Sequence, residues 1–274
     1  MKWKSIIIGM GLSLILTGCS WGQSSNSSSQ ETETPDVEQE QSGEQKEKTE
    51  NSEQQNEQEE NLPAAQEKES EKKDSDGLTI VNEPKSIQVV VNKQRKLPEG
   101  YKPPDLVVPD VPFYFNEFHP KKQMREEAAH ALEALFAGAK KNGIDLVAAS
   151  GYRSYERQKS IYEQNVAERG EEEANQFSAK PGTSEHQTGL AMDVTSAQVA
   201  FKLKQSFRQT NEGEWLANHA HEYGFVIRYL EGKSDITGYS YEPWHLRYVG
   251  KDISTNIHNQ GETLEEFFGL HPSS

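Results

Sequence analysis

The apolar positions of this 274-residue chain divide it into three parts. Residues 6–16 form a continuous apolar run near the N-terminus, whereas residues 20–76 contain few apolar residues and no regular spacing among them. From residue 77 onward, apolar positions recur with the periods of helices and strands. The pattern therefore predicts a leader, a tail that builds no core, and one folded domain.

Helical and strand periods alternate within that domain. Ser154 has a typical N-cap side chain, and Gly143 and Gly224 stand where glycine commonly ends a helix. The predicted order is a strand at 87–91, a helix at 122–141, a strand at 144–149, a helix from Ser154 to Gly170, a strand at 190–194, a helix at 214–223, strands at 225–229 and 244–249, and a helix at 264–268. This mixture, with its short connections, predicts an α+β domain.

Charge is distributed unevenly between the tail and the domain. Residues 20–76 hold 17 acidic residues and 5 lysines, a net charge of −12 out of −15 for the whole chain. Such a segment cannot bury enough apolar surface to offset its ordering entropy, so residues 19–77 are predicted to be a disordered acidic spacer. A coil of this length reaches about 40 Å. The same composition also fits a solvated tail with no further role.

The charge pattern also limits the partners. Neither the tail nor the domain has the basic stripe that binding to phosphates requires, so no nucleic-acid partner is expected. The single apolar run is too short to cross a bilayer as a helix, which excludes a polytopic membrane protein. With one cysteine in the chain, no internal disulfide can form.

The N-terminal residues predict export and attachment to a membrane. A basic start, the apolar run and Leu16-Thr-Gly-Cys19 indicate a signal peptide at 1–18. The Leu-x-Gly-Cys ending resembles a bacterial lipoprotein signal, which implies cleavage before Cys19 and a lipid on its thiol. Two acyl chains give stable anchoring, so the expected location is the outer face of a bacterial cell membrane. An ordinary signal peptide with a chance cysteine is the alternative.

Two segments of the domain carry candidate metal ligands. His186 and Asp193 are separated by six residues, and Glu242 precedes His245 by three. Two histidines and one carboxylate form a three-ligand set for a catalytic zinc, with the fourth position left for water. Such an ion lowers the pKa of its water to about 7. Glu242 is then a second carboxylate, free to act as a general base.

This assignment requires two irregularities in the backbone. On a regular strand His186 and Asp193 would point to opposite faces, and so would Glu242 and His245. Gly189 must therefore break the first segment, and Pro243 must bend the second.

Other candidate residues carry weaker signals. Ser70-Glu-Lys-Lys73 matches the S-x-x-K pattern of serine enzymes, but it lies in the predicted spacer and lacks a Lys-Thr-Gly partner. The histidines outside the two segments are expected at the surface: His119, His130, His219, His221, His258 and His271.

Three motifs together resemble a known family of zinc enzymes. Ser150-Gly-Tyr-Arg-Ser154, Ser184-Glu-His-Gln-Thr-Gly-Leu-Ala-Met-Asp193 and Glu242-Pro-Trp-His-Leu-Arg-Tyr248 are similar to the VanY-type D-alanyl-D-alanine carboxypeptidases, and the likeness covers roughly residues 85–270. It implies a hedgehog/DD-peptidase-like catalytic domain at 78–274, with a small antiparallel sheet flanked by helices. It also implies one Zn²⁺ per chain.

The resemblance assigns a role to each site residue. It makes His186, Asp193 and His245 the zinc ligands, Glu242 the base, Arg153 the residue that binds the oxyanion or the terminal carboxylate, and Gln158 and Ser184 further substrate-binding residues. Each substrate-binding residue also has a structural alternative: a surface salt bridge for Arg153, a place on the surface of a helix for Gln158 and a turn cap for Ser184. Trp244 fits either the wall of the pocket or the core.

The implied activity is removal of the C-terminal D-alanine from peptidoglycan stem peptides. Relatives act either on tetrapeptides, as L,D-carboxypeptidases, or on D-Ala-D-Ala pentapeptides, as D,D-carboxypeptidases. Overall likeness in the first two motifs slightly favours the L,D reaction. A zinc module that binds the cell wall without catalysis is the alternative from another class, and the presence of Glu242 argues against it.

Overall fold

The computed structural model describes residues 71–270. The signal peptide predicted at 1–18, the lipidation site predicted at Cys19 and residues 19–70 of the predicted spacer lie outside the described residues. Within the described part, no helix is both long and apolar enough to cross a membrane.

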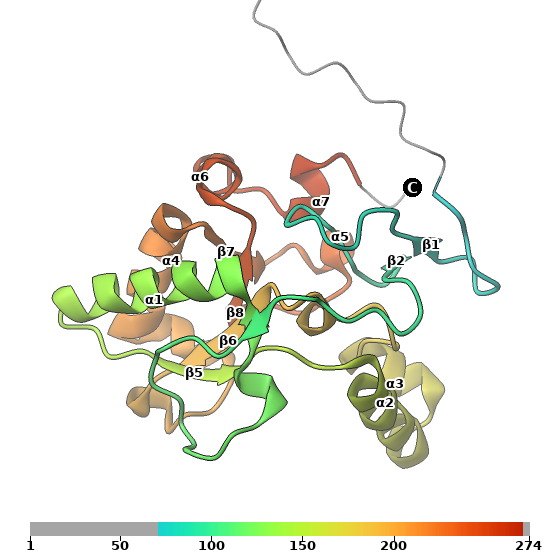
Figure 1. The fold of residues 1–274 in the computed structure, drawn as a ribbon, viewed down its shortest axis with the longest axis horizontal. Helices are drawn as coiled ribbons and strands as arrows, with labels where there is room; N and C mark the ends of the chain where they lie inside the picture. Colours follow the sequence, from blue (N-terminus) through green and yellow to red (C-terminus); the bar gives the residue numbers. More distant parts are fainter. Residues whose placement is uncertain (1–70, 271–274) are drawn as a thin grey trace, which may run out of the picture. The chain divides into compact units, whose positions relative to one another are not determined.

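A four-stranded antiparallel sheet forms the centre of the domain, with strand order β5-β6-β8-β7 (Figure 1). Its strands are β5 (Val147–Ser150), β6 (Ala191–Thr195), β7 (Phe225–Tyr229) and β8 (Glu242–Tyr248). Met192 of β6 pairs with Leu246 of β8, and both side chains lie in the main hydrophobic core. Because side chains alternate along a strand, the neighbouring pair Asp193 and His245 points to the opposite face. The alternation therefore separates an apolar face from a face that carries polar groups.

Helix α1 (Glu126–Lys141) supplies most of the cover for the apolar face. Its buried Leu132 and Leu135 belong to the same core as Met192 and Leu246, and α4 (Asn211–His219) adds Leu216 to it. A smaller apolar cluster contains Val226 of β7 together with residues of α6 (Lys251–Gln260) and α7 (Leu264–Phe267). The domain thus has the predicted α+β architecture, with a small antiparallel sheet flanked by helices.

The remaining elements surround this sheet. Helices α2 (Tyr155–Arg169) and α3 (Glu171–Phe177) pack together after β5 (Figure 1). The others are the parallel pair β1 (Thr79–Ile80) and β2 (Arg95–Lys96), the antiparallel pair β3 (Leu106–Val107) and β4 (Met124–Arg125), the short helix α5 (Ser234–Thr237), and 3₁₀ turns at Pro120–Lys122, Glu185–Thr188, Ala197–Val199, Gln205–Gln209 and Ala220–Tyr223.

Several predicted elements differ from the observed ones. The strand predicted at 87–91 is wrong: residues 87–88 form a turn, residues 89–91 have no regular secondary structure, and the Ile87 and Val89 carbonyls accept hydrogen bonds from Arg247 instead of from a neighbouring strand. The helix predicted from residue 122 starts at Glu126, because Met124 and Arg125 pair with β3. Helices α3 and α6 were not predicted. Ser154 does cap α2, because its Oγ accepts a hydrogen bond from the Arg157 amide.

The folded part also begins earlier than the predicted boundary at residue 78. Lys73 pairs with Thr79, the Arg95 guanidinium binds the Glu71 carboxylate, and Lys96 Nζ lies 2.7 Å from Asp74 Oδ2. Composition assigned residues 71–77 to the acidic spacer because they are charged. Their partners in β2 follow more than 20 residues later, at a distance that composition does not detect.

Candidate active site

The structure brings His186, Asp193 and His245 together on the polar face of the sheet. Asp193 of β6 lies directly opposite His245 of β8, and His186 comes from the 3₁₀ turn Glu185–Thr188 just before β6. Gly189 ends that turn in the left-handed region, with φ +69°. The break predicted at Gly189 is therefore confirmed, and it places His186 in a turn rather than in the strand.

The bend predicted at Pro243 is also present. Ile227 and Tyr229 are two positions apart along β7, but their partners in β8, Leu246 and Glu242, are four positions apart. The extra residues of β8 form a bulge next to the site. As a result, Glu242 Oε2 lies 3.7 Å from His245 Nδ1, so both side chains face the same centre.

The three side chains have the spacing and chemistry of a metal-ligand set. One ligand atom from each of them lies within 4.8 Å of the others, and all three residues are buried. His186 Nδ1 lies 2.8 Å from the Gly151 carbonyl oxygen, which leaves Nε2, 3.5 Å from Asp193 Oδ2, for a metal. Asp193 Oδ1 is buried and lies 3.1 Å from His245 Nδ1, without a hydrogen bond of normal geometry. A buried carboxylate between two imidazole nitrogens is a donor set that suits a divalent cation, so the residues fit a zinc ion.

The pKa shifts of three ionisable groups at the site indicate different roles for them. Burial lowers the pKa of His186 to about 3, so this imidazole is neutral and ready to ligate. Burial acts in the same direction on His245, but the neighbouring carboxylates of Asp193 and Glu185 outweigh it and raise its pKa to about 9. Burial raises the pKa of Glu242 to about 7, although His245 and Arg153 oppose this. A carboxylate with a pKa near neutrality suits proton transfer.

A buried charge network behind His245 was missed in the sequence. Glu185 Oε2 lies 3.3 Å from His245 Nε2, and the same carboxylate binds Arg228 and Arg247. These two arginines outweigh the effect of burial and hold the pKa of Glu185 well below its usual range. The sequence does contain one signal of this network. Arg228 and Arg247 stand in strands that are otherwise largely apolar, and a buried charge needs a partner.

Arg153 lies beside the ligand set, as expected. Its backbone amide donates to the His186 carbonyl, and its guanidinium donates to Gln158 Oε1 at 2.9 Å. Burial lowers its pKa, while the charges of Asp193 and Glu242 counteract the decrease. No ion pair to Arg153 is formed within residues 71–270, so the surface salt bridge considered as the alternative is not observed there.

Gln158 and Ser184 are both buried. The Gln158 amide is occupied at both ends, because Oε1 accepts from Arg153 and Nε2 donates to the Ala179 carbonyl at 2.6 Å. In this structure Gln158 therefore orients Arg153. Ser184 precedes the turn that carries His186 but does not cap it with its side chain. Trp244 packs against the main hydrophobic core.

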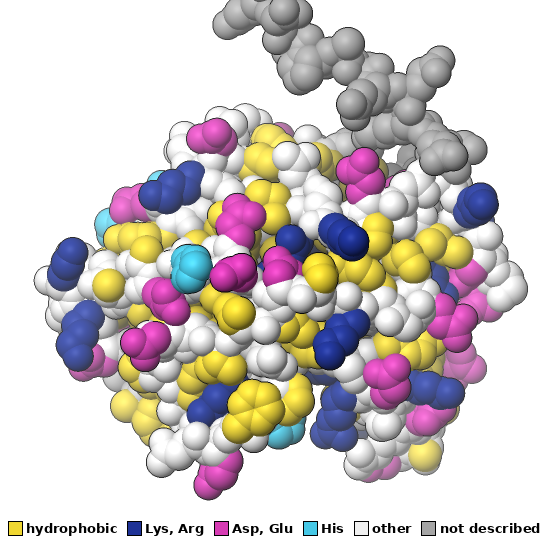
Figure 2. Space-filling view, viewed as in Figure 1, with side chains coloured by type: hydrophobic (Ala, Val, Ile, Leu, Met, Phe, Trp, Pro, Cys, Tyr) yellow, Lys and Arg dark blue, Asp and Glu magenta, His cyan; other side chains and the backbone are white. Residues whose placement is uncertain are grey.

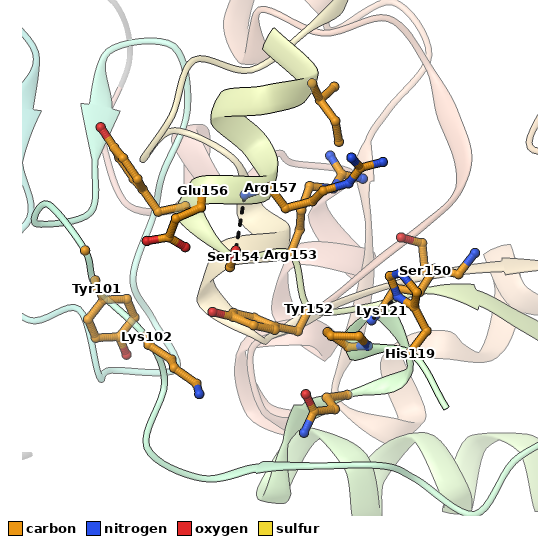
Figure 3. Close-up of a pocket in the computed structure, with 15 residues that line it drawn as sticks. Tyr101, Lys102, His119, Lys121, Ser150, Tyr152, Arg153, Ser154, Glu156 and Arg157 are labelled. Atoms are coloured by element: carbon orange, nitrogen blue, oxygen red, sulfur yellow. Dashed lines mark hydrogen bonds between the residues drawn. The ribbon is translucent and has the colours of Figure 1, made fainter. Parts of the chain in front are cut away.

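A cavity of about 670 Å³ opens beside Arg153. Figure 3 shows Arg153, Tyr152 and Lys121 around it, together with the first turn of α2. The lining contains more cationic than acidic side chains: Lys102, Lys121, Arg153 and Arg157, with Glu156 as the acid. Figure 2 shows dark blue Lys and Arg side chains beside a notch near α2. The cavity therefore favours an anionic ligand next to the metal-ligand set.

The histidines outside the site form no second metal group within the described residues. His219 pairs with Glu222, and His221 stacks on His258 with 3.7 Å between the ring centroids. His119 is exposed, as predicted, and also lines the cavity. His271 lies outside the described residues.

Two histidines and an aspartate at a bulged sheet, with a glutamate of raised pKa beside them, have the composition of a metallopeptidase active site. The VanY family model, described as D-alanyl-D-alanine carboxypeptidase, matches residues 121–251. The "Putative carboxypeptidase YodJ" of Bacillus subtilis (strain 168) is 51% identical over 193 residues, which are 70% of this chain and 71% of that protein. The chain belongs to the VanY family of carboxypeptidases.

Solved structures show the same likeness. The LdcB LD-carboxypeptidase is 50% identical, with a TM-score of 0.71 over 74% of this chain and 94% of that chain. The vancomycin resistance D,D-pentapeptidase VanY, solved in complex with Zn(II), is 32% identical, with a TM-score of 0.54 over 66% of this chain and 98% of that one. These relatives include both an L,D- and a D,D-enzyme.

Proposed function

We propose that this protein is a zinc-dependent carboxypeptidase that removes the C-terminal D-alanine from peptidoglycan stem peptides. The observation that carries the proposal is the buried set of His186, Asp193 and His245, in which one ligand atom from each residue lies within 4.8 Å of the others. The zinc complex of the VanY relative supports this metal. The set provides three ligands and is proposed to hold one Zn²⁺ per chain.

The residues around the ligand set have different roles in the proposed hydrolysis. A bound zinc ion supplies Lewis acidity and lowers the pKa of a water molecule. Glu242 takes a proton from the attacking water, whose oxygen bonds to the carbonyl carbon before the terminal D-alanine. As the C–N bond breaks, Glu242 returns that proton to the leaving amine. The raised pKa of Glu242 suits it to both steps.

Arg153 gives the enzyme its preference for the end of a peptide. An exopeptidase must recognise a free terminal carboxylate, and the planar guanidinium can bind one with two hydrogen bonds. Gln158 holds this guanidinium at 2.9 Å, and the cationic cavity attracts the carboxylate. Ser184, which is buried beside the turn of His186, is proposed as a further substrate contact.

We favour the L,D reaction on tetrapeptides over the D,D reaction on pentapeptides. Its support is the greater likeness to the LdcB LD-carboxypeptidase, at 50% identity, than to the D,D-pentapeptidase, at 32%. A curated D-alanyl-D-alanine carboxypeptidase of Enterococcus faecalis, 39% identical over 145 residues, favours the alternative.

Purified stem peptides distinguish the two reactions. The tetrapeptide and the pentapeptide are incubated separately with the protein, and the released D-alanine is measured with and without a zinc chelator. We expect faster release from the tetrapeptide and loss of release with the chelator. Faster release from the pentapeptide would reverse the assignment to the L,D reaction, and release from neither peptide would contradict the proposed function.

We also propose that the protein is anchored to the outer face of a bacterial cell membrane through a lipid on Cys19. The support is the sequence Leu16-Thr-Gly-Cys19 after an apolar run, in a chain with no other cysteine. The acidic segment that follows would then separate the catalytic domain from the bilayer.

A further inference from the structure

Four fully buried charged side chains lie behind the metal-ligand set. They are Glu185, Arg228, Arg247 and Glu265. These side chains form ion pairs with one another, and the exposed fraction of each is 0%. Two positive and two negative charges balance one another. Four buried charges are costly to desolvate, and hydrophobic residues could fill the same volume. Their arrangement therefore calls for an explanation beyond stability.

Glu185 connects this network to the metal-ligand set. Arg228 Nε and an Arg247 terminal nitrogen both lie 2.7 Å from Glu185 Oε1, which leaves Oε2 facing His245 Nε2 at 3.3 Å. The other ring nitrogen, His245 Nδ1, faces Asp193. A carboxylate on the far nitrogen of a metal-ligating histidine fixes the orientation and tautomer of the ring.

Arg228 is held in turn by Glu265, far along the chain. Both terminal nitrogens of Arg228 donate to the Glu265 carboxylate, at 2.8 and 2.7 Å. Asn92 Nδ2 donates to the same carboxylate at 2.9 Å. Glu265 belongs to α7, whose first turn is fixed by a capping box between Thr263 and Glu266. The helix thus presents Glu265 in a defined position.

We propose that Glu265 is a positioning residue for the metal centre, acting through Arg228 and Glu185 on the ligand His245. This proposal rests on the proposed zinc site. Helix α7 lies beyond residues 121–251, the part matched by the family model. In this proposal α7 supports the metal centre through Glu265, although it provides none of the three proposed ligands.

The test compares two neighbouring glutamates of α7. Glu265→Gln removes the buried charge with little change in shape. Glu266→Gln is the matched control, because Glu266 pairs with Lys233 near the surface and glutamine also serves in a capping box. Zinc dissociation constants are measured by chelator competition on the full protein. We expect Glu265→Gln to weaken zinc binding about tenfold, as loss of an outer-shell partner typically does, and Glu266→Gln to leave it unchanged.

Two further readouts separate positioning from a general loss of structure. Added zinc should restore kcat in Glu265→Gln while KM stays at the wild-type value. The absorption spectrum of the cobalt-substituted protein should also change in Glu265→Gln and not in Glu266→Gln, because it reports the geometry of the ligands. If Glu265→Gln does not fold, Glu265→Asp keeps the charge and moves the carboxylate by one methylene, and the same zinc measurement applies.

A double-mutant cycle tests whether Glu265 acts through Glu185. In a Glu185→Gln background, Glu265→Gln should weaken zinc binding by much less than tenfold, because the link to His245 is already broken. An undiminished effect in that background, or equal zinc affinity of the wild type and Glu265→Gln, would overturn the proposal. If the wild-type protein itself bound no zinc, the proposed function would fail instead.

Discussion

Asp193 and His245 face each other across the central strands β6 and β8, with 3.1 Å between Asp193 Oδ1 and His245 Nδ1. Neither residue type is common inside an apolar sheet. The register between β6 and β8 is regular at this pair. A bulge interrupts the pairing of each of these two strands with its other neighbour. The pair therefore forms the rigid base of the site, onto which the turn that contains Gly189 adds His186.

We expect His186→Ala to remove most of the zinc from the purified protein. The imidazole is one of three ligands, and its Nδ1 is committed to the Gly151 carbonyl oxygen. A site with two ligands left should bind zinc much more weakly. Metal content per chain is the measurement, and His219→Ala is the control, because His219 is half-buried, lies outside the ligand set and pairs with Glu222. Full zinc content in His186→Ala would contradict the assignment of this ligand.

Zinc uptake by the metal-free protein should release protons. The pKa of His245 is raised to about 9, so its ring is protonated at pH 7, whereas a ligating imidazole must be neutral. Binding at pH 7 therefore displaces about one proton from this residue, and the apparent affinity falls by about tenfold for each pH unit below 9. Calorimetry in two buffers of different ionisation enthalpy gives the number of protons. A pH-independent affinity between pH 6 and 8 would refute the prediction.

We expect Glu242→Gln to abolish most of the activity and to keep the zinc. Glu242 lies close to His245 but outside the three-residue ligand set. Loss of a general base or acid typically costs 10²–10⁴ in rate, so kcat should fall by about this factor. Zinc content and D-alanine release are measured on the same sample, with the exposed Glu231→Gln as the control. If zinc were lost together with activity, Glu242 would be a ligand and not the base.

Single residues in the sequence predicted those features of the site that depend only on the local backbone. Ser154 as a cap, the break at Gly189 and the bend at Pro243 all follow from the backbone preferences of single residues. The strand predicted at 87–91 failed because its carbonyls are taken by Arg247, some 160 residues later. No periodicity reveals such a contact.

The charge network behind the site was missed for the same reason. Glu185 stands next to His186 in a recognised motif, but its role depends on Arg228, Arg247 and Glu265, which reach it only in the folded state. Glu265 and its neighbour Glu266 look alike in the sequence. One is fully buried and the other forms a surface ion pair, and only the tertiary fold distinguishes them.

We expect Cys19→Ala to release the protein from the membrane fraction. The proposed lipid would be attached to this thiol, and two acyl chains are the source of stable anchoring. Fractionation of cells that express either form, followed by detection of the protein in the pellet and the supernatant, measures the effect. The control is Ser20→Ala, which changes a neighbouring residue and keeps the thiol. Equal amounts of Cys19→Ala and wild type in the pellet would reject the lipid anchor.

The last prediction concerns the free carboxylate of the substrate. Arg153 lies at the cavity with its guanidinium held by Gln158, and it is assigned to the terminal carboxylate. Amidation of that carboxylate removes a charge-assisted contact of about 1.5–3 kcal/mol for each hydrogen bond, so kcat/KM should fall at least tenfold. Arg153→Lys should show a similar loss on the free peptide, because lysine lacks the planar fork, and only a small further loss on the amide. Lys159→Gln, an exposed change in the same helix, is the control. Equal cleavage of the free and amidated peptides by the wild type would remove Arg153 and Gln158 from the recognition of the carboxylate.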